Sequence, residues 1–450
     1  MKIIVFDDDP TGSQTVFGCP LLLKWDYETL DKGIKSPSPL LFLLTNTRAL
    51  SANQAEARIR DICKLLRKIL KANDLKLKDI YFISRGDSTL RGHWVLEPRI
   101  LDEELGPFDA TFHVPAFLEG GRTTFEDQHF LNSIPVHKTM FGKDTIFGYS
   151  TNHLPSLLEE KSNGQINSKD VVSISIEQLD MAKESERGMA KLIDHISSLS
   201  ANQNVVVNAC IHMHLNSFAE AIRRVKGKKN FLFRSAASFI NSLSDISPES
   251  NINNDFSSLR LKDSLGNPKP GLVLVGSHVK LSGQQLDYLM QESSCIGVEL
   301  PVQEIVRFKS GIISDEIIAD LEKIWFDQLM RIIQMKKTPV LYTSRGELIF
   351  PSDYQRIEFG IFLAELMARL AAKLENYLGY IISKGGITTH ILLSKGLKLS
   401  SVDLQGQILP GLSVVCSNRQ GVRNLPILTF PGNLGDQTTL FKTWKMMDSY

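Results

Sequence analysis

The sequence lacks paired cysteines and long apolar runs. Its five cysteines are widely spaced, form no CxxC motif and are odd in number, which argues against a disulfide framework and against a zinc site. No segment reaches the roughly 18 consecutive apolar residues that a membrane-spanning helix needs. The start, MKIIVFDDDP, becomes acidic too early for a signal peptide. We therefore expect a cytoplasmic protein with no membrane partner.

The sequence also has no excess of charge of either sign. Its 51 basic side chains nearly balance 50 acidic ones, giving a formal net charge of +1, so no overall field attracts nucleic acid. We expect no nucleic-acid partner, and any anionic ligand must be bound by local groups. With 450 residues, the chain is longer than the roughly 250 to 300 residues that one hydrophobic core serves. Two domains are therefore expected.

Apolar stretches of strand length alternate with stretches of helical periodicity along most of the chain. Strands that are apolar on both faces and separated by helices are typical of parallel sheets in α/β proteins. The segment 241–270 is rich in Ser, Asn, Asp and Pro and poor in apolar residues, which is typical of a linker. The sequence thus predicts two α/β domains with mainly parallel sheets, 1–240 and 271–450, facing a central cleft.

Three consecutive carboxylates, Asp7, Asp8 and Asp9, follow the first apolar run. Neighbouring carboxylates raise each other's pKa, so their clustering indicates a function. One interpretation is a D-x-D-x-T pattern of the haloacid-dehalogenase type, in which Asp7 is an aspartyl nucleophile and Asp9 its partner. Another is a simple turn in which Asp9 caps a helix. In an alternating strand, Asp7 and Asp8 would point to opposite faces.

Two further strand ends carry side chains that suit a sugar acid. The segment SRGDSTLRGH places two arginines around an acid and two hydroxyls, namely Arg85, Asp87, Ser88, Thr89 and Arg91. Arginine suits bidentate binding of a carboxylate, and hydroxyls with an acid suit a polyol. The segment LEGGRTT adds Arg122 after a Gly-Gly turn. An internal salt bridge and a structural turn are the alternatives, but three polar strand ends of one sheet would converge on one edge.

Three glycine-containing loops occur in the second half of the chain. They are VGSH, SKGGITT and PGNLGD, and their candidate phosphate-binding residues are Ser277, Gly385, Gly386, Ile387, Thr388, Gly432, Asn433 and Gly435. Each loop precedes a helical stretch and offers backbone N–H groups or hydroxyls to a phosphate. None is a Walker loop or a GxGxxG motif, and each could be an ordinary turn, so the loops alone do not identify a nucleotide.

These motifs together resemble the four-carbon acid sugar kinase family. DDPTG, SRGDSTLRGH, PAFLEGGRTT, FRSAASF and the three glycine loops occur in the family's order along nearly the whole chain. The resemblance implies a sugar-acid-binding N-terminal domain, a nucleotide-binding C-terminal domain, and the cofactors ATP and Mg²⁺. The chain departs from the family pattern at Ile387 and Asn208, where the family has acidic residues, and at Phe430-Pro431, where it has Lys-Ser.

The resemblance implies an ATP-dependent kinase that phosphorylates threonate, erythronate or a 3-oxo-tetronate on its terminal hydroxyl. Asp8 would orient or deprotonate this hydroxyl, while Arg85 and Arg91 would hold the substrate carboxylate and keep the acidic cluster ionised. The implied catalytic residues are Asp8, Asp87 and Arg91, and the implied substrate-binding residues are Asp9, Thr11, Gly12, Arg85, Ser88, Thr89 and Arg122. No metal ligand is assigned, and a homodimer is compatible with the resemblance. An inert sugar-acid or nucleotide sensor and a phosphatase remain the alternatives.

Overall fold

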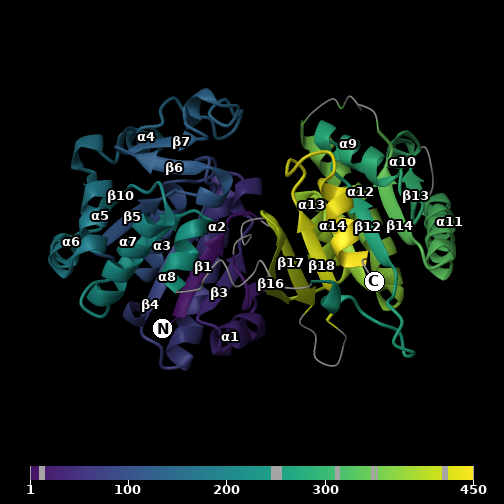
Figure 1. Ribbon diagram of the computed structural model, residues 1–450, viewed down its shortest axis with the longest axis horizontal. Helices are drawn as coiled ribbons and strands as arrows, with labels where there is room; N and C mark the ends of the chain where they lie inside the picture. Colours follow the sequence, from purple (N-terminus) through teal and green to yellow (C-terminus); the bar gives the residue numbers. More distant parts are fainter. Residues whose placement is uncertain are drawn as a thin grey trace. The chain divides into compact units, whose positions relative to one another are not determined.

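The structure is a computed structural model that describes residues 2–9, 16–244, 256–309, 315–345, 350, 353–417 and 424–448. The chain divides into two compact units, Met1–Glu249 and Ser250–Tyr450. They are coloured purple to teal and green to yellow in Figure 1. Each unit is an α/β sheet covered by helices, which confirms the predicted fold class of two α/β domains.

The first unit is built on a parallel sheet whose strands lie in the order β2-β3-β1-β4-β11-β5-β10-β9. Its strands are β1 Lys2–Asp7, β2 Cys19–Leu22, β3 Leu40–Leu44, β4 Ile80–Arg85, β5 Ala110–Val114, β9 Val172–Ile174, β10 Gln203–Val207 and β11 Phe231–Ser235. Strands β3, β4, β5 and β11 are buried along their whole length, because helices cover both faces of the sheet.

The helices of this unit follow the strands in an alternating order (Figure 1). They are α1 Tyr27–Lys35, α2 Ala52–Ala72, α3 Leu96–Leu105, α4 Leu154–Lys161, α5 Ile176–Glu184, α6 Glu186–Ser198, α7 His212–Val225 and α8 Ala237–Ser244. A small antiparallel sheet, β6 Arg122–Phe125, β7 Gln128–Leu131 and β8 Ile134–Pro135, follows β5. The parallel strands bring the ends of β1, β4, β5 and β11 to one edge of the main sheet.

The second unit has a sheet in the order β13-β14-β12-β15-β18-β17-β16. Its strands are β12 Gly271–Val275, β13 Cys295–Leu300, β14 Thr338–Thr343, β15 Tyr380–Lys384, β16 Ser401–Leu409, β17 Leu412–Ser417 and β18 Pro426–Phe430. The first five strands in this order are parallel, and the hairpin β16–β17 is antiparallel. The helices are α9 Lys280–Leu289, α10 Val302–Lys309, α11 Asp315–Gln334, α12 Asp353–Leu374, α13 Gly386–Ile391 and α14 Thr439–Asp448.

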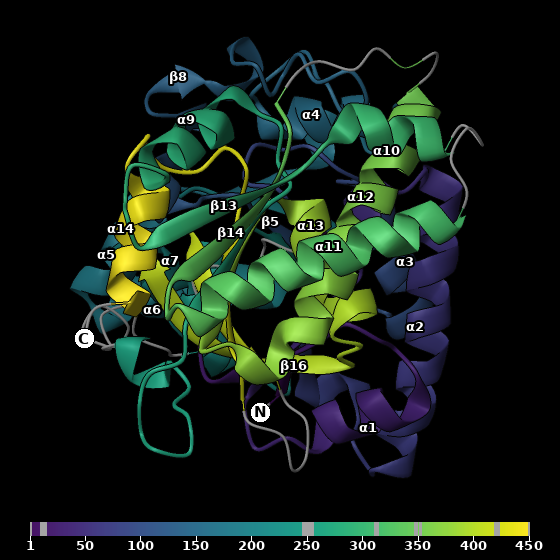
Figure 2. The ribbon, with the colours of Figure 1, turned by 90° about the vertical axis from the view of Figure 1, so that its right-hand side faces the viewer.

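Helices cover both faces of this second sheet. Helices α9 and α14 pack together, and α11 packs against α12 (Figure 2). Strand β12 leads to β13 in one direction across the sheet and β13 leads back to β14, so right-handed crossovers place α9 and α11 on opposite faces. The carboxyl ends of β12, β15 and β18 therefore meet at one edge, where ligands bind in such sheets.

Two local features differ from the sequence prediction. The helical periodicity near 181–199 predicts one helix, but the structure has two helices in this region. The Oγ of Ser185 accepts a hydrogen bond from the Gly188 N–H at 3.0 Å and caps the start of α6. The segment 241–270, expected to be a linker, is partly folded. Helix α8 continues to Ser244, and Phe256–Leu259 form a 3₁₀ turn that packs against α14. Residues 245–255 lie outside the described residues.

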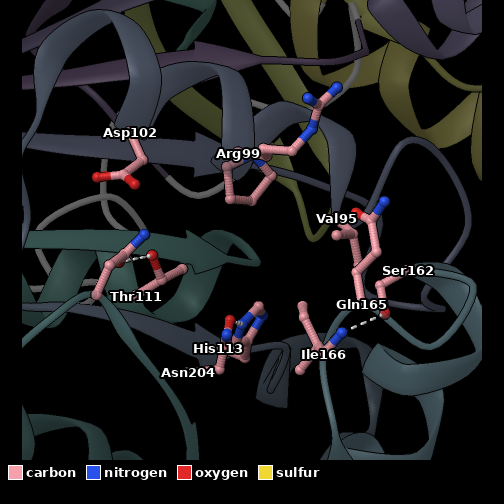
Figure 3. Close-up of a pocket in the computed structure, with 11 residues that line it drawn as sticks. Val95, Arg99, Asp102, Thr111, His113, Ser162, Gln165, Ile166 and Asn204 are labelled. Atoms are coloured by element: carbon pink, nitrogen blue, oxygen red, sulfur yellow. Dashed lines mark hydrogen bonds between the residues drawn. The ribbon is translucent and has the colours of Figure 1, made fainter.

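A cavity of about 170 Å³ opens in the first unit, between α3, the loop after α4 and the beginnings of β5 and β10 (Figure 3). Its lining consists of Val95, Pro98, Arg99, Asp102, Thr111, His113, Ser162, Gln165, Ile166, Asn202 and Asn204. None of these residues was predicted to bind a ligand. The candidate site lies instead at the carboxyl ends of the strands.

Candidate active site

The acidic cluster at the end of β1 faces an arginine from the neighbouring strand. Asp7 ends β1, and the parallel register pairs it with Arg85 at the end of β4. The Nη1 of Arg85 lies 3.4 Å from Asp7 Oδ1 and 3.7 Å from Asp8 Oδ1. The prediction that Asp7 and Asp8 point to opposite faces is therefore wrong, because the strand ends at Asp7 and strand alternation does not extend to Asp8.

Asp8 is fully buried and is held by a second arginine, Arg48, which lies outside the sequence motifs. Arg48 donates to both carboxylate oxygens of Asp8, from Nη2 at 2.6 Å and from Nε at 3.2 Å. Its Nη1 also donates to Asp9 Oδ2 at 2.9 Å. Arg48 follows the strand β3, which neighbours β1. The pairing of an arginine fork with a carboxylate fixes the orientation of Asp8.

Burial divides the carboxylates of this site into two electrostatic classes. Burial raises the pKa of Asp7 to about 7, against the effect of Arg85. Burial and the nearby Glu97 also raise the pKa of Asp8, although Arg48, Arg234 and Arg85 oppose this. By contrast, Arg48 and Arg91 outweigh burial at Asp87 and hold its pKa well below the usual range. The arginines, which were expected to keep the whole cluster ionised, therefore do not fully offset the effect of burial on the pKa of Asp7 or of Asp8.

The loop after β4 orients Asp87 through its own residues. The Oδ2 of Asp87 accepts hydrogen bonds from Thr89 Oγ1 and from Arg91 Nε, the latter at 2.7 Å. Arg91 also lies 3.6 Å from Asp144 and stacks over the ring of Phe141. Arg91 is therefore a partner of Asp87, whereas Arg48 takes the position beside Asp8 and Asp9.

The Gly92 backbone allows this loop to approach Asp8 closely. Its φ of +94° is one that L side chains rarely adopt, and a Cβ there would lie 3.0 Å from Asp8 Oδ2. The carbonyl of Ser88 meets the Nε2 of His129 from β7 at 2.7 Å. Burial lowers the pKa of His129 to about 4, so this imidazole is neutral at physiological pH and its Nε2–H donates to the carbonyl. The small sheet thereby fixes the loop.

A second missed arginine, Arg234 from β11, lies fully buried below the acidic cluster. Its Nη1 donates to Ser84 Oγ at 2.6 Å and to Glu97, and its Nη2 lies 4.0 Å from Asp8 Oδ2. The indole of Trp94 stacks on its guanidinium at 4.8 Å. The sequence signal was present in FRSAASF, but only the position of β11 beside β4 shows that Arg234 reaches Asp8.

Arg122, which follows the end of β5, belongs to the same group of charged residues as Asp87. It begins β6, its Nη1 donates to the Gly120 carbonyl, and its guanidinium lies over the Phe117 ring. Burial lowers the pKa of Arg122, and the charge of Asp87 partly offsets this effect. Among the described residues, the Nε atoms of Arg85, Arg122 and Arg234 have no hydrogen-bond partner. These three donors are buried and unsatisfied. Thr11 and Gly12 lie outside the described residues.

In the second unit, the predicted phosphate-binding loops converge. The Gly385 N–H donates to the Phe430 carbonyl at 2.8 Å, and the Gly276 N–H donates to the Lys384 carbonyl at 3.2 Å. A Cβ at Gly276 would lie 2.1 Å from Thr388 Oγ1, and one at Gly432 would lie 2.7 Å from Ser277 Oγ. The structure thus brings Ser277, Gly385, Thr388 and Gly432 together.

The remaining predicted phosphate-binding residues are less closely packed. A Cβ at Gly386, the first residue of α13, would meet no heavy atom within 4 Å. The side chain of Ile387 is 53% exposed, and Asn433 and Gly435 are exposed in the loop before α14. The N–H groups of a helix's first turn have no intrahelical partners, so the start of α13 offers donors beside open space.

Comparison with known proteins identifies the two units. Residues 3–243 match the family model described as a sugar-binding N-terminal domain, and residues 272–440 match that of a nucleotide-binding C-terminal domain. The chain belongs to the four-carbon acid sugar kinase family. Family membership assigns sugar binding to the first unit and nucleotide binding to the second.

Solved structures agree with the fold. The chain is 18% identical to a Haemophilus influenzae protein over 99% of both chains, with a TM-score of 0.69. It is 17% identical to a Salmonella typhimurium LT2 protein over 98% of both chains, with a TM-score of 0.68. At these identities the likeness shows the fold. No protein of curated function matches the chain.

Two negative findings concern the part of the chain that the structure describes. None of its helices is long and apolar enough to cross a membrane. None of its groups of His, Cys, Asp and Glu side chains has three or more members placed to hold a metal ion.

Proposed function

We propose that this protein is an ATP-dependent kinase that phosphorylates a four-carbon sugar acid of the threonate, erythronate or 3-oxo-tetronate type on its terminal hydroxyl. The observation that carries the proposal is the buried Asp8, which lies within 4.0 Å of three arginines at the strand ends of a sugar-binding domain. The same chain has a nucleotide-binding domain. A kinase uses both domains.

The first unit would hold the sugar acid through its arginines and hydroxyls. The unpaired Nε donors of Arg85 and Arg122 suit the substrate carboxylate. Ser88 and Thr89 would contact substrate hydroxyls together with Asp9, Thr11 and Gly12. Asp87, which its neighbours keep ionised, would accept a hydrogen bond from a substrate hydroxyl. Arg91 would keep Asp87 in place.

Asp8 would act as the general base. Its oxygens are fixed by Arg48, and its raised pKa makes it a better proton acceptor than an exposed aspartate. As the substrate oxygen forms its bond to the γ-phosphorus, the bond from phosphorus to the ADP oxygen breaks and the hydroxyl proton passes to Asp8. Such transfer depends chiefly on positioning and on charge stabilisation.

The second unit would bind ATP at the glycine loops. The hydroxyls of Ser277 and Thr388 and the N–H groups at Gly386 and Ile387 would face phosphate oxygens, beside the turn at Gly385, with Gly432, Asn433 and Gly435 in the third loop. Mg²⁺ usually keeps several waters and binds through one or two carboxylates and the substrate phosphates. It would neutralise charge on the transferring phosphoryl group, and no protein ligand is assigned to it.

Two other functions make different demands. A phosphatase of the haloacid-dehalogenase type needs an ionised and accessible Asp7, but this carboxyl is 1% exposed and burial raises its pKa to about 7. A sugar-acid or nucleotide sensor would bind both ligands without turnover, and the site's contacts are compatible with it.

The kinase is tested by screening threonate, erythronate and their 3-oxo forms for ADP release with Mg-ATP. Release that depends on one of these acids is the expected result. ATP binding and acid binding without ADP release from the folded protein would indicate the sensor instead. Release of phosphate from a phosphorylated acid would indicate the phosphatase.

A further inference from the structure

The second unit buries a lysine at the centre of its glycine loops. Lys384 ends β15, its side chain has no exposed surface, and it directly precedes Gly385. Its ammonium Nζ lies 3.2 Å from the Pro431 carbonyl oxygen and 3.3 Å from that of Gly432. It also lies 3.8 Å from the centre of the Phe430 ring. Lys384 therefore contacts the end of β18 and the loop that follows it.

This ammonium group is surrounded by neutral groups. Among the described residues, no carboxylate lies within ion-pair distance of Lys384, and its ammonium group contacts carbonyl oxygens and an aromatic ring. Buried charges in proteins are normally paired with an opposite charge, because desolvation is costly. An anion that binds nearby would stabilise the charged form of a lysine in this position.

A second cation lies at the same edge of the sheet. Arg345 donates from Nη1 to the Ser277 carbonyl at 2.6 Å, so a second cation lies at the first glycine loop. The Gly432 residue that Lys384 contacts lies against Ser277, since a Cβ at Gly432 would lie 2.7 Å from Ser277 Oγ. Two cations thus flank the loops that we assign to the phosphates.

We propose that Lys384 is the buried counter-charge of the nucleotide's phosphates. It is a positioning residue that contacts the carbonyl of Gly432 in the third glycine loop. The proposal rests on the proposed function, because it takes the glycine loops as the phosphate site. The phosphates need not touch Lys384, since a charge in a medium of low polarity acts over several ångströms. The phosphates would favour its ammonium form.

This role links nucleotide binding to a proton. Burial, with a smaller effect from Arg345, lowers the pKa of Lys384 to about 7, so above that pH the empty protein holds mostly the neutral amine. Bound phosphates raise the pKa, and the protein takes up a proton as ATP binds. ATP affinity should therefore be highest below pH 7 and should fall by up to about tenfold per pH unit above it.

Other titratable groups near the loops do not change charge in this window. Burial and Arg345 lower the pKa of His278, which stays neutral above pH 7. Burial raises the pKa of Tyr342. Burial lowers the pKa of Arg345, but Asp287 and Glu299 oppose this effect and Arg345 remains a cation. Of these groups near the glycine loops, Lys384 is the one whose charge changes between pH 7 and pH 9.

The test is calorimetry of ATP binding to the full chain at pH 8, in buffers of different ionisation enthalpy. The dependence of the binding enthalpy on the buffer gives the number of protons taken up. We expect the unchanged protein to take up between about half a proton and one proton. This measurement needs no variant, so it decides the question even if substitutions at a buried position prevent folding.

Variants separate charge from structure. Lys384→Met should lose the proton uptake and at least about tenfold in ATP affinity, whereas Lys384→Arg should keep the affinity and lose the uptake and the pH dependence. Lys395→Met, at an exposed lysine paired with Glu365, is the matched control and should change neither. Adenosine carries no phosphate, and its affinity should be the same with and without the Lys384 ammonium.

The outcomes distinguish this inference from the proposed function. ATP binding by the unchanged protein without proton uptake would overturn the role of Lys384 and leave the kinase intact. Uptake that persists in Lys384→Met would also overturn it. A folded protein that binds no ATP would overturn the kinase and this role together.

Discussion

At the scale of the residue, burial and neighbouring charges set the proton affinity of each carboxylate in the site. Asp8 has no exposed surface and shares two hydrogen bonds with Arg48, yet its pKa is raised, because burial outweighs the arginines around it. Asp87 lies only one loop away and keeps its charge. Carboxylates of different proton affinity within one site are typical of acid–base chemistry.

The assignment of the base to Asp8 predicts the behaviour of two isosteric substitutions. Asp8→Asn keeps the size of the side chain but removes the proton acceptor, so turnover should fall by roughly 10² to 10⁴. Binding of the sugar acid should persist. Asp7→Asn should have a milder effect, because burial already favours the neutral carboxyl there up to a pH of about 7. Steady-state rates of ADP release measure both effects.

The same pair of variants separates the kinase from the phosphatase. A phosphatase of the haloacid-dehalogenase type would form an aspartyl-phosphate on Asp7, which mass spectrometry of the quenched reaction detects. An inactive Asp7→Asn beside an active Asp8→Asn, or a phosphorylated Asp7, would refute the role of Asp8. Circular dichroism spectra of both variants provide the control for folding.

At the scale of the element, the turn from β15 into α13 determines how a phosphate approaches. Gly385 has a φ of +123°, and its N–H is bound to the Phe430 carbonyl. The next residue, Gly386, starts α13, and no heavy atom lies within 4 Å of where its Cβ would be. Close packing therefore constrains one side of this turn, while the other side is open.

This difference predicts that a side chain at Gly386 disturbs the ligand and spares the fold. Gly386→Val should lower ATP affinity by about tenfold or more, because a branched side chain would occupy the space beside the first N–H groups of the helix. Stability should hardly change. Calorimetry with ATP and a thermal melt give the two quantities.

Two other glycines of the unit serve as controls. Gly283→Val in α9 also meets open space and should leave ATP affinity unchanged. Gly276→Ala should destabilise the protein, since its Cβ would lie 2.1 Å from Thr388 Oγ1. ATP affinity that is equal in Gly386→Val and the unchanged protein would move the phosphate site away from α13.

At the scale of the whole molecule, two compact units carry the two family domains. Each unit has its own core and its own set of polar strand ends. The contacts described for the acidic cluster come from the first unit, and those of the glycine loops come from the second. The ligands should therefore have separable binding sites, although turnover needs both.

Substitutions in one unit should consequently spare the ligand of the other. In the full chain, Arg85→Gln should weaken sugar-acid binding at least about tenfold, because a charge-assisted hydrogen bond is lost, while ATP affinity stays the same. Gly386→Val should show the reverse pattern. Separate titrations with each ligand measure this. A loss of both affinities in a folded Arg85→Gln protein would contradict the assignment of one ligand to each unit.

The sequence by itself determined the fold class and the positions of most candidate residues. Strands such as LLFLLT are apolar on both faces, which requires helices on both sides of a parallel sheet. Polar residues directly after those strands had to meet at one edge. The hairpin β16–β17 had no comparable signal and was missed, and Ser185, an ordinary residue in the sequence, divides a predicted helix.

Only the tertiary structure decided which charges meet. Arg48 reaches Asp8 across 40 residues because β3 lies beside β1, and Arg234 reaches it from much further along the chain because β11 lies beside β4. The tertiary structure also determines that Asp8 and Lys384 are buried. A sequence fixes which groups can ionise, but their pKa depends on the depth and the neighbours that strand order gives them, and strand order is set by packing between distant segments.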